Sequence, residues 1–94
     1  MKIAAHETEL IGKWLTSAQG LTKDQVAERI DQLVAHYLVE LGTDSSGWDV
    51  LFRDPSDGRL WELTYPQSGL AGGGPPRLIC IDVDIARKKY GPTV

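Results

Sequence analysis

An amphipathic helix pattern in the middle of the chain constrains the fold more than any other feature. Thr22 and Gln25 form a capping-box pattern at its start, and Gly42 is placed to end it. Between these positions the apolar residues recur at helical spacing, as a single stripe. These residues are Val26, Ile30, Leu33, Val34, Tyr37, Leu38 and Leu41. The pattern predicts a helix over about residues 23–41 whose apolar stripe packs on another layer.

Two runs of alternating residues after this helix predict the layer that covers it. Residues 48–53 and 60–65 alternate with period two and are rich in aromatic and β-branched side chains, which is typical of half-buried strands. Between them lies the sequence Asp-Pro-Ser-Asp-Gly (54–58), which has the residues of a hairpin turn. We therefore expect the two strands to pair antiparallel.

The ends of the chain complete an α+β domain. Residues 78–83 are almost continuously apolar and predict a third strand, and residues 84–90 predict a short terminal helix before Gly91. Periodicity does not distinguish a strand from a short helix over residues 10–15. We expect one domain over residues 1–94, with two layers: a long helix packed on an antiparallel sheet of three or four strands.

Composition excludes several classes of protein. The chain has 94 residues, 41% of them hydrophobic, and its longest apolar runs fall well short of the roughly 20 residues of a membrane span. The first residues lack the apolar segment of a secretory signal. The single Cys80 excludes an intrachain disulfide and fits a reducing compartment. A net charge of -3 argues against nucleic-acid binding. We expect a cytoplasmic protein that binds neither nucleic acid nor membrane.

The residues that most often carry catalysis or bind metals do not form a recognisable set. His6 and His36 have no third ligand at metal spacing. Cys80 lies in the middle of an apolar strand, where a small buried side chain is expected. Asp82 and Asp84 lie at the start of the terminal helix, where one of them can cap it, and helix capping is a better interpretation than Mg²⁺ binding. We therefore expect no catalytic residues, no metal and no cofactor.

The loop over residues 66–76 and the tryptophans are the other candidates for function. Loops of this length are often functional, but the triple glycine (72–74) leads into two prolines and a strand, unlike a phosphate-binding loop. Trp14, Trp48 and Trp61 are expected to pack in the core. An exposed tryptophan would indicate a binding surface.

Charge is distributed unevenly along the chain. Residues 22–57 contain three basic and eight acidic side chains, whereas residues 58–94 contain five basic and three acidic ones. Asp24, Glu28 and Asp31 fall on the outer face of the predicted helix. This face is either simply solvated or complementary to a basic partner.

The second half of the chain resembles the immunity protein 27 family of bacterial polymorphic toxin systems. The segments that carry the resemblance are Arg-Asp-Pro (53–55), Asp-Gly-Arg (57–59), Trp-Glu-Leu-Thr-Tyr-Pro-Gln-Ser (61–68) and Gly-Gly-Gly-Pro-Pro (72–76). Residues 10–14 and 86–91 are also similar, so the resemblance covers nearly the whole chain. It implies a small, non-catalytic α+β protein that binds and neutralises a toxin.

If the resemblance holds, the toxin is the expected partner, and a nuclease with a basic surface would suit an acidic inhibitor. The candidate toxin-binding residues are Asp24, Glu28, Asp31, Asp57, Tyr65 and Gln67. The alternative is a module that binds a small ligand, or a scaffold, using the face of the sheet and the glycine-rich loop.

Overall fold

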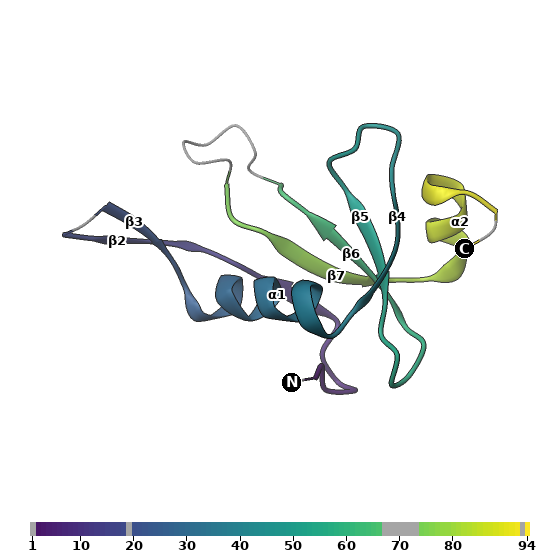
Figure 1. Ribbon diagram of the computed structural model, residues 1–94, viewed down its shortest axis with the longest axis horizontal. Coiled ribbons are helices and arrows are strands. Elements are labelled where there is room, and N and C mark those ends of the chain that lie inside the picture. Colours follow the sequence, from purple (N-terminus) through teal and green to yellow (C-terminus); the bar gives the residue numbers. More distant parts are fainter. Residues whose placement is uncertain (1, 19, 67–73, 93) are drawn as a thin grey trace.

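The computed structural model describes residues 2–18, 20–66, 74–92 and 94. In these residues the chain forms, in order, β1 (Glu9–Ile11), β2 (Trp14–Ser17), β3 (Gly20–Lys23), α1 (Gln25–His36), β4 (Val39–Thr43), β5 (Val50–Arg53), β6 (Leu60–Thr64), β7 (Arg77–Ile81) and α2 (Val83–Tyr90). Five strands make one antiparallel sheet in the order β1-β7-β6-β5-β4, and β2 and β3 pair separately as a hairpin (Figure 1). The α+β class and the short C-terminal helix are confirmed, but the sheet has five strands where three or four were expected.

One of the additional strands, β4, is formed in part by residues that the apolar pattern assigns to the helix. The range of about 23–41 is wrong at both ends, since α1 begins at Gln25 and ends at His36. Asp24 caps it in place of Thr22, because its carboxylate accepts a hydrogen bond from the Ala27 amide at 2.7 Å while Thr22 is paired with Leu15 in the hairpin. The chain then turns and continues as β4.

Strand β4 explains why helical spacing overestimated α1. Val39 and Glu40 pair with Arg53 and Phe52 of β5, so the ladder satisfies backbone groups that a longer helix would have used internally. Gly42 lies in β4, where it pairs with Leu51 of β5, and so does not end the helix. The apolar residues at these positions suit an edge strand as well as a helix.

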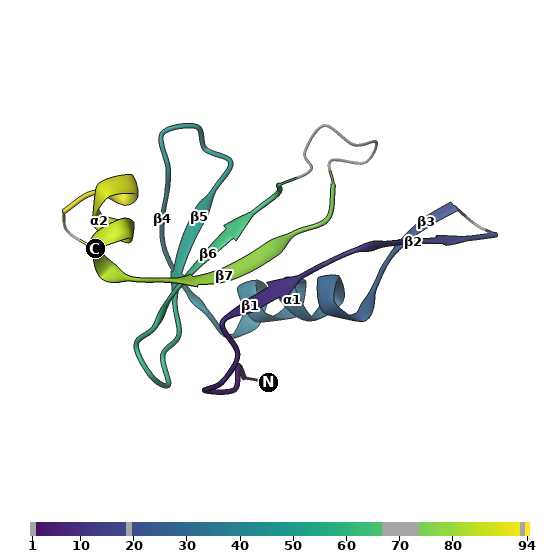
Figure 2. The same cartoon turned by 180° about the vertical axis from the view of Figure 1, so that it is seen from behind.

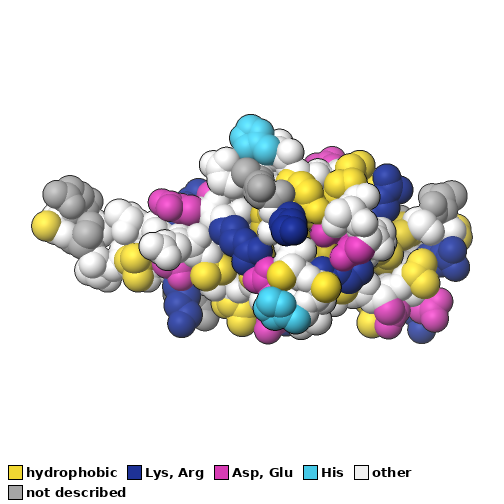
Figure 3. All heavy atoms as spheres, turned by 90° about the horizontal axis from the view of Figure 1, so that it is seen from below, with side chains coloured by type: hydrophobic (Ala, Val, Ile, Leu, Met, Phe, Trp, Pro, Cys, Tyr) yellow, Lys and Arg dark blue, Asp and Glu magenta, His cyan; other side chains and the backbone are white. Residues whose placement is uncertain are grey.

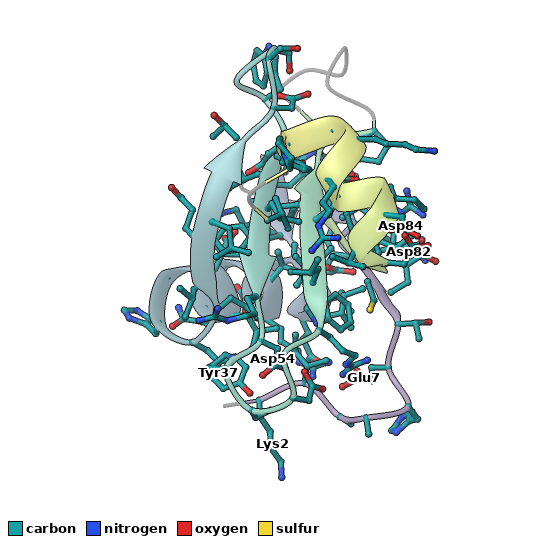
Figure 4. All side chains as sticks on the ribbon, turned by 90° about the vertical axis from the view of Figure 1, so that its right-hand side faces the viewer. Lys2, Glu7, Tyr37, Asp54, Asp82 and Asp84 are labelled. Atoms are coloured by element: carbon teal, nitrogen blue, oxygen red, sulfur yellow. The ribbon has the colours of Figure 1, made fainter. Side chains whose placement is uncertain are left out.

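The two helices cover opposite faces of the sheet. Ile30 and Leu33 of α1 pack in the main core with Trp61, Leu63 and Leu78 from the central strands. Figure 4 shows α2 in front of the sheet and α1 behind it. Asp82 caps α2 through a hydrogen bond from the Ile85 amide, as its position before the helix predicts.

Helix α2 is bound to its face by a polar cluster around Glu62. This residue lies between Trp61 and Leu63 in β6 and so points to the opposite face. The Tyr90 hydroxyl donates to Glu62 Oε2 at 2.8 Å, and Lys89 Nζ lies 2.7 Å from the same oxygen. Burial and the Glu62 carboxylate both raise the pKa of Tyr90.

The β2–β3 hairpin extends away from the rest of the fold, and we call it the arm (Figures 1 and 2). Gly12 connects it to β1 at a crowded point, where its amide donates to the Pro76 carbonyl at 2.8 Å. A Cβ at Gly12 would lie 2.9 Å from both that oxygen and the Ala27 Cβ. The chain therefore passes from β1 into the arm at a position where only glycine fits. We call the rest of the fold, without the arm, the body.

Within the part of the chain that the structure describes, neither helix is long and apolar enough to span a bilayer.

Candidate functional site

A cleft lies where the arm, α1 and the loop before β5 come together. Its volume is about 270 Å³. The residues that line it are Trp14, Lys23, Asp31, Trp48, Tyr65, Gly74 and Pro76. These residues lie far apart in the sequence, and four of the seven are aromatic rings or proline, so the cleft is mostly apolar with one pair of opposite charges.

Trp48 is the most exposed large side chain of the cleft. Its exposed fraction is 68%, whereas Trp61 is completely buried and Trp14 is half-buried. The prediction that all three tryptophans lie in the core is therefore wrong for Trp48. With the other rings of the cleft it forms an exposed apolar surface, which is typical of interaction sites.

The loop that carries Trp48 is held by its own hydrogen bonds. The Asp44 carboxylate accepts from the Ser46 hydroxyl at 2.7 Å and from the Gly47 amide at 3.1 Å. The Ser46 hydrogen bond is the main reason that the pKa of Asp44 lies below its ordinary value. Lys89 also donates to Asp49 at 2.7 Å and ties the loop to α2. Trp48 is thus presented to solvent by an ordered loop.

One ion pair lies in the wall of the cleft. Lys23 lies at the base of the arm, where β3 leads into α1, and donates to the carboxylate of Asp31 on α1. Asp31 is the main cause of the raised pKa of Lys23, and Tyr65 and Glu28 add smaller contributions. The side chains of Lys23 and Asp31 are 45% and 41% exposed, and pairs as open to water as this contribute about 0–1 kcal/mol. A partner can therefore replace this pair at little cost.

The structure brings only some of the predicted binding residues together. Asp31 and Tyr65 both line the cleft. Glu28 is exposed one turn from Asp31 and, with Lys23 and Asp31, borders a shallow hollow. Asp24 lies nearby but accepts hydrogen bonds from the Ala27 and Lys13 amides, so its carboxylate serves the fold.

The remaining two candidates are not part of the cleft. Asp57 lies in the β5–β6 turn, at the opposite end of β6 from Tyr65, and is paired with Arg59 at 2.7 Å. Gln67 lies outside the described residues. The other five residues of the cleft were absent from the predicted set: Trp14, Lys23, Trp48, Gly74 and Pro76. The only signal for them was the rule that an exposed tryptophan indicates binding.

We call the region around the β5–β6 turn the closed end, because its polar side chains bind one another. It comprises Glu7, Arg29, Tyr37, Asp54, Asp57 and Arg59. Tyr37 and Asp54 point toward each other beneath the sheet (Figure 4), and the Tyr37 hydroxyl donates to Asp54 Oδ1 at 2.6 Å. Burial raises the pKa of Asp54, but hydrogen bonds from Tyr37 and Ser56 outweigh it, and that pKa lies below its ordinary value.

Two arginines fasten the N-terminal segment to the closed end. Arg29 donates to both carboxylate oxygens of Glu7 at 2.7 Å, and this pairing lowers the pKa of Glu7 to about 2. The Arg59 guanidinium lies 5.0 Å from the centre of the Trp61 ring and donates to the carbonyls of Ala4 and Glu7. The side chains of Glu7, Arg29 and Arg59 are therefore already bound by other groups of the same chain.

Charged side chains are mixed on the α1 side of the molecule. Figure 3 shows acidic and basic side chains next to one another there, among hydrophobic ones. The uneven charge of the sequence therefore does not translate into a single acidic patch on that face. Among the described residues, no three His, Cys, Asp or Glu side chains are grouped as metal ligands would be.

A larger hollow adjoins the cleft and shares Trp14 and Pro76 with it. Its volume is about 730 Å³. It is lined by Glu9, Ile11, Gly12, Lys13, Trp14, Pro66, Pro75, Pro76 and Arg77. Two of its charged side chains, Arg77 and Glu9, already form an ion pair with each other.

Comparison with known protein families gives a match over most of the chain. The model of immunity protein 27 matches residues 16–82, which run from the second half of β2 through β7 to Asp82, the residue that caps α2. The chain belongs to the immunity protein 27 family. It is thus an immunity protein of a polymorphic toxin system, and the family is non-catalytic. No curated protein and no solved structure matches the chain.

Proposed function

We propose that this immunity protein binds its cognate toxin directly and neutralises it without catalysis, in the cytoplasm where such proteins typically act. The observation that carries the proposal is Trp48, which is 68% exposed and held by an ordered loop at the edge of the cleft. An aromatic side chain that is already ordered loses little conformational entropy on binding, so more of its contact energy appears as affinity.

The arm adds contact surface to the cleft. Leu21 is 55% exposed on the face of the arm that carries Trp14, and within the described residues the outer half of the arm stands clear of both helices and of the five-stranded sheet (Figure 1). Specific interfaces bury about 800 Å² on each partner, more than a cleft of this size supplies. We propose that the toxin contacts the cleft and the adjoining surface of the arm together.

We further propose that the toxin has a basic surface, as a nuclease does. The support is the sequence from residue 22 to residue 57, which has five more acidic than basic side chains. Nucleases hold phosphate groups with Lys and Arg, so an acidic inhibitor is attracted to the same surface. Such attraction acts mainly on the association rate and weakens with salt.

The test is co-expression with the toxin domain encoded beside this gene. Growth should be restored, and the two proteins should co-purify as a stable complex. Trp48→Ala should weaken both results, whereas Ile85→Ala, an exposed apolar residue on α2, should leave them unchanged. Rescue of growth without a complex would contradict direct inhibition.

The second candidate is a module that binds a small ligand in the larger hollow beside Trp14. The hollow is roomy enough, at about 730 Å³, for a ligand of drug size. It is open on one side, and Arg77 and Glu9 pair across its edge, which leaves few convergent polar groups for a ligand. A thermal-shift screen of the purified chain tests it: a ligand whose effect is lost in Ile11→Asp would favour this candidate.

A further inference from the structure

We propose that the cleft receives an arginine side chain of the toxin, stacked against Trp48 and Trp14 and paired with Asp31 in place of Lys23. This inference rests on the proposed function and identifies the chemistry of its contact surface. It is carried by the placement of a carboxylate among aromatic rings in a cleft that is open to solvent.

The cleft already binds a cation supplied by its own chain. Lys23 Nζ is bonded to Asp31, and its charge is also stabilised by the nearby carboxylate of Glu28. The position next to Asp31 is therefore electrostatically suited to a positive group. In the free protein Lys23 fills that position through a long side chain that is 45% exposed and can move aside.

Among the cationic side chains, arginine fits these surroundings best. Its planar guanidinium stacks on aromatic faces and forms two parallel hydrogen bonds with a carboxylate, whereas an ammonium group does neither as well. Trp14, Trp48 and Tyr65 supply rings, and Asp31 supplies the carboxylate. A volume of about 270 Å³ accommodates one long side chain and not a folded segment.

The arm extends the same surface beyond the cleft. Trp14 pairs with Lys23 and Thr16 pairs with Leu21, so these four side chains share one face of the arm. Leu21 is 55% exposed on that face. An apolar side chain next to the toxin's arginine would contact Leu21, which excludes water from around the charge pair.

The positive charge that we propose for the toxin's contact group follows from which carboxylates of this chain can exchange their present ion-pair or hydrogen-bond partner. At the closed end the carboxylates of Glu7, Asp54 and Asp57 are each bound within the chain, two of them by arginine. Asp31 is bound only by the exposed Lys23 among the interactions of the described residues. Asp31 is thus the carboxylate that lines the cleft and that an incoming cation can reach, and the exposed Glu28 lies one turn away, beside the cleft.

The toxin domain encoded beside this gene is obtained from the co-expressed complex. The experiment then measures the dissociation constant of that toxin domain for variants of the immunity protein. We expect Trp48→Ala to weaken binding at least 30-fold, and Asp31→Asn about 10-fold. Lys23→Gln should strengthen binding about 3-fold, because it removes the internal competitor for Asp31. Gain of affinity on loss of a lysine is a result that damage to the fold does not produce.

Matched controls lie on α2, on the other face of the sheet. Asp84→Asn and Lys88→Gln remove the same charges as the test variants at exposed positions, and both should stay within 2-fold of the wild type. If Lys88→Gln strengthens binding as much as Lys23→Gln does, general attraction to a basic toxin explains the gain and the proposed contact is overturned.

The arginine is identified on the toxin itself by modification with phenylglyoxal. In the complex, one toxin arginine should be protected, and it should become reactive when the immunity protein carries Trp48→Ala at saturating concentration. If Trp48→Ala weakens binding while Asp31→Asn has no effect and no arginine is protected, an apolar anchor occupies the cleft and the inference fails. If the wild-type chain does not bind the toxin at all, the proposed function fails instead.

Discussion

The closed end and the cleft lie at opposite ends of the central strands and use similar side chains differently. At the closed end Trp61 is buried beneath Arg59, and Asp54 accepts three hydrogen bonds from Tyr37 and Ser56. At the cleft Trp48 faces solvent, and Asp31 is held by one exposed lysine. The same residue types stabilise the fold when they are enclosed and offer a binding surface when they are open.

This difference shows that acidic composition alone does not locate a binding site. Asp57 and Asp31 were equally good candidates by charge, but one is paired in a tight turn with Arg59 and the other borders an apolar cleft. What separates them is the surrounding apolar surface: at the cleft, aromatic rings can pack around a new ion pair and exclude water from it, whereas Asp57 is already paired with Arg59. Variants at both ends of the molecule, and at the glycine that joins the arm to the body, test that separation.

Gly12→Ala should destabilise the fold severely, because it changes the crossing between the arm and the body. The added Cβ would meet the Pro76 carbonyl oxygen and the Ala27 Cβ at 2.9 Å, and neither neighbour is the flexible end of a long side chain. We expect a loss of about 2–4 kcal/mol in the free energy of unfolding, or at least about 10 °C in Tm. Thermal unfolding followed by circular dichroism measures it. A Tm within 2 °C of the wild type would show that β1 and the arm adjust freely to the body.

Asp54→Ala should cost about 2–3 kcal/mol in the free energy of unfolding, because it removes three hydrogen bonds that Tyr37 and Ser56 donate to a buried carboxylate. Urea denaturation measures the loss. Asp54→Asn retains an acceptor oxygen and should cost clearly less. The affinity of the folded variants for the toxin should not change. Weaker binding by a fully folded Asp54→Asn protein would mean that the closed end also contacts the toxin.

Stability should fall in acid through Glu7. Its pKa in the folded state is about 2, below the ordinary value of 4.5, so the ion pair with Arg29 stabilises the fold fully above pH 4.5 and is lost as the pH falls toward 2. The pair is partly exposed, and we expect a contribution of about 1–2 kcal/mol. Tm measured against pH should show Glu7→Gln less stable than the wild type at pH 6 and equal to it near pH 2. A difference that is constant over this range would assign the effect to packing.

Trp48→Ala should change the free energy of unfolding by less than about 0.5 kcal/mol, because an exposed side chain loses little contact with the core. Together with a large loss of toxin affinity, this small effect would complete the contrast with the buried Trp61. Urea denaturation of Trp48→Ala and of Trp61→Ala makes the comparison directly. A loss above 1.5 kcal/mol for Trp48→Ala would mean that its ring supports the arm.

Local patterns predicted the parts of the fold that depend on neighbouring residues. The β5–β6 hairpin follows from its turn residues, and α2 begins after Asp82 as capping chemistry requires. The length of α1 could not be predicted in this way, because Leu38 and Leu41 continue the helical spacing although they lie beyond the end of α1. The pairing of β4 with β5 is set by tertiary contacts, which override local preference.

The candidate site was predicted in part for the same reason. Asp31 and Tyr65 were identified from charge and from the position of the loop, and both line the cleft. Trp48 was assigned to the core because it alternates with Val50 and Phe52. Its exposure depends on hydrogen bonds from Ser46 and Gly47 to Asp44, which place it in a turn just before the strand begins. The alternation of apolar and polar residues does not indicate where such a turn lies.

The arm has a consequence for how this protein can diversify. Its exposed residues, such as Leu15 and Leu21, contribute little to the core, so substitutions there change the contact surface at a small cost in stability. Gly12 does not share this freedom, because the crossing between arm and body admits no side chain. A lineage of immunity proteins facing altered toxins can therefore vary recognition along the arm while the inherited scaffold stays the same.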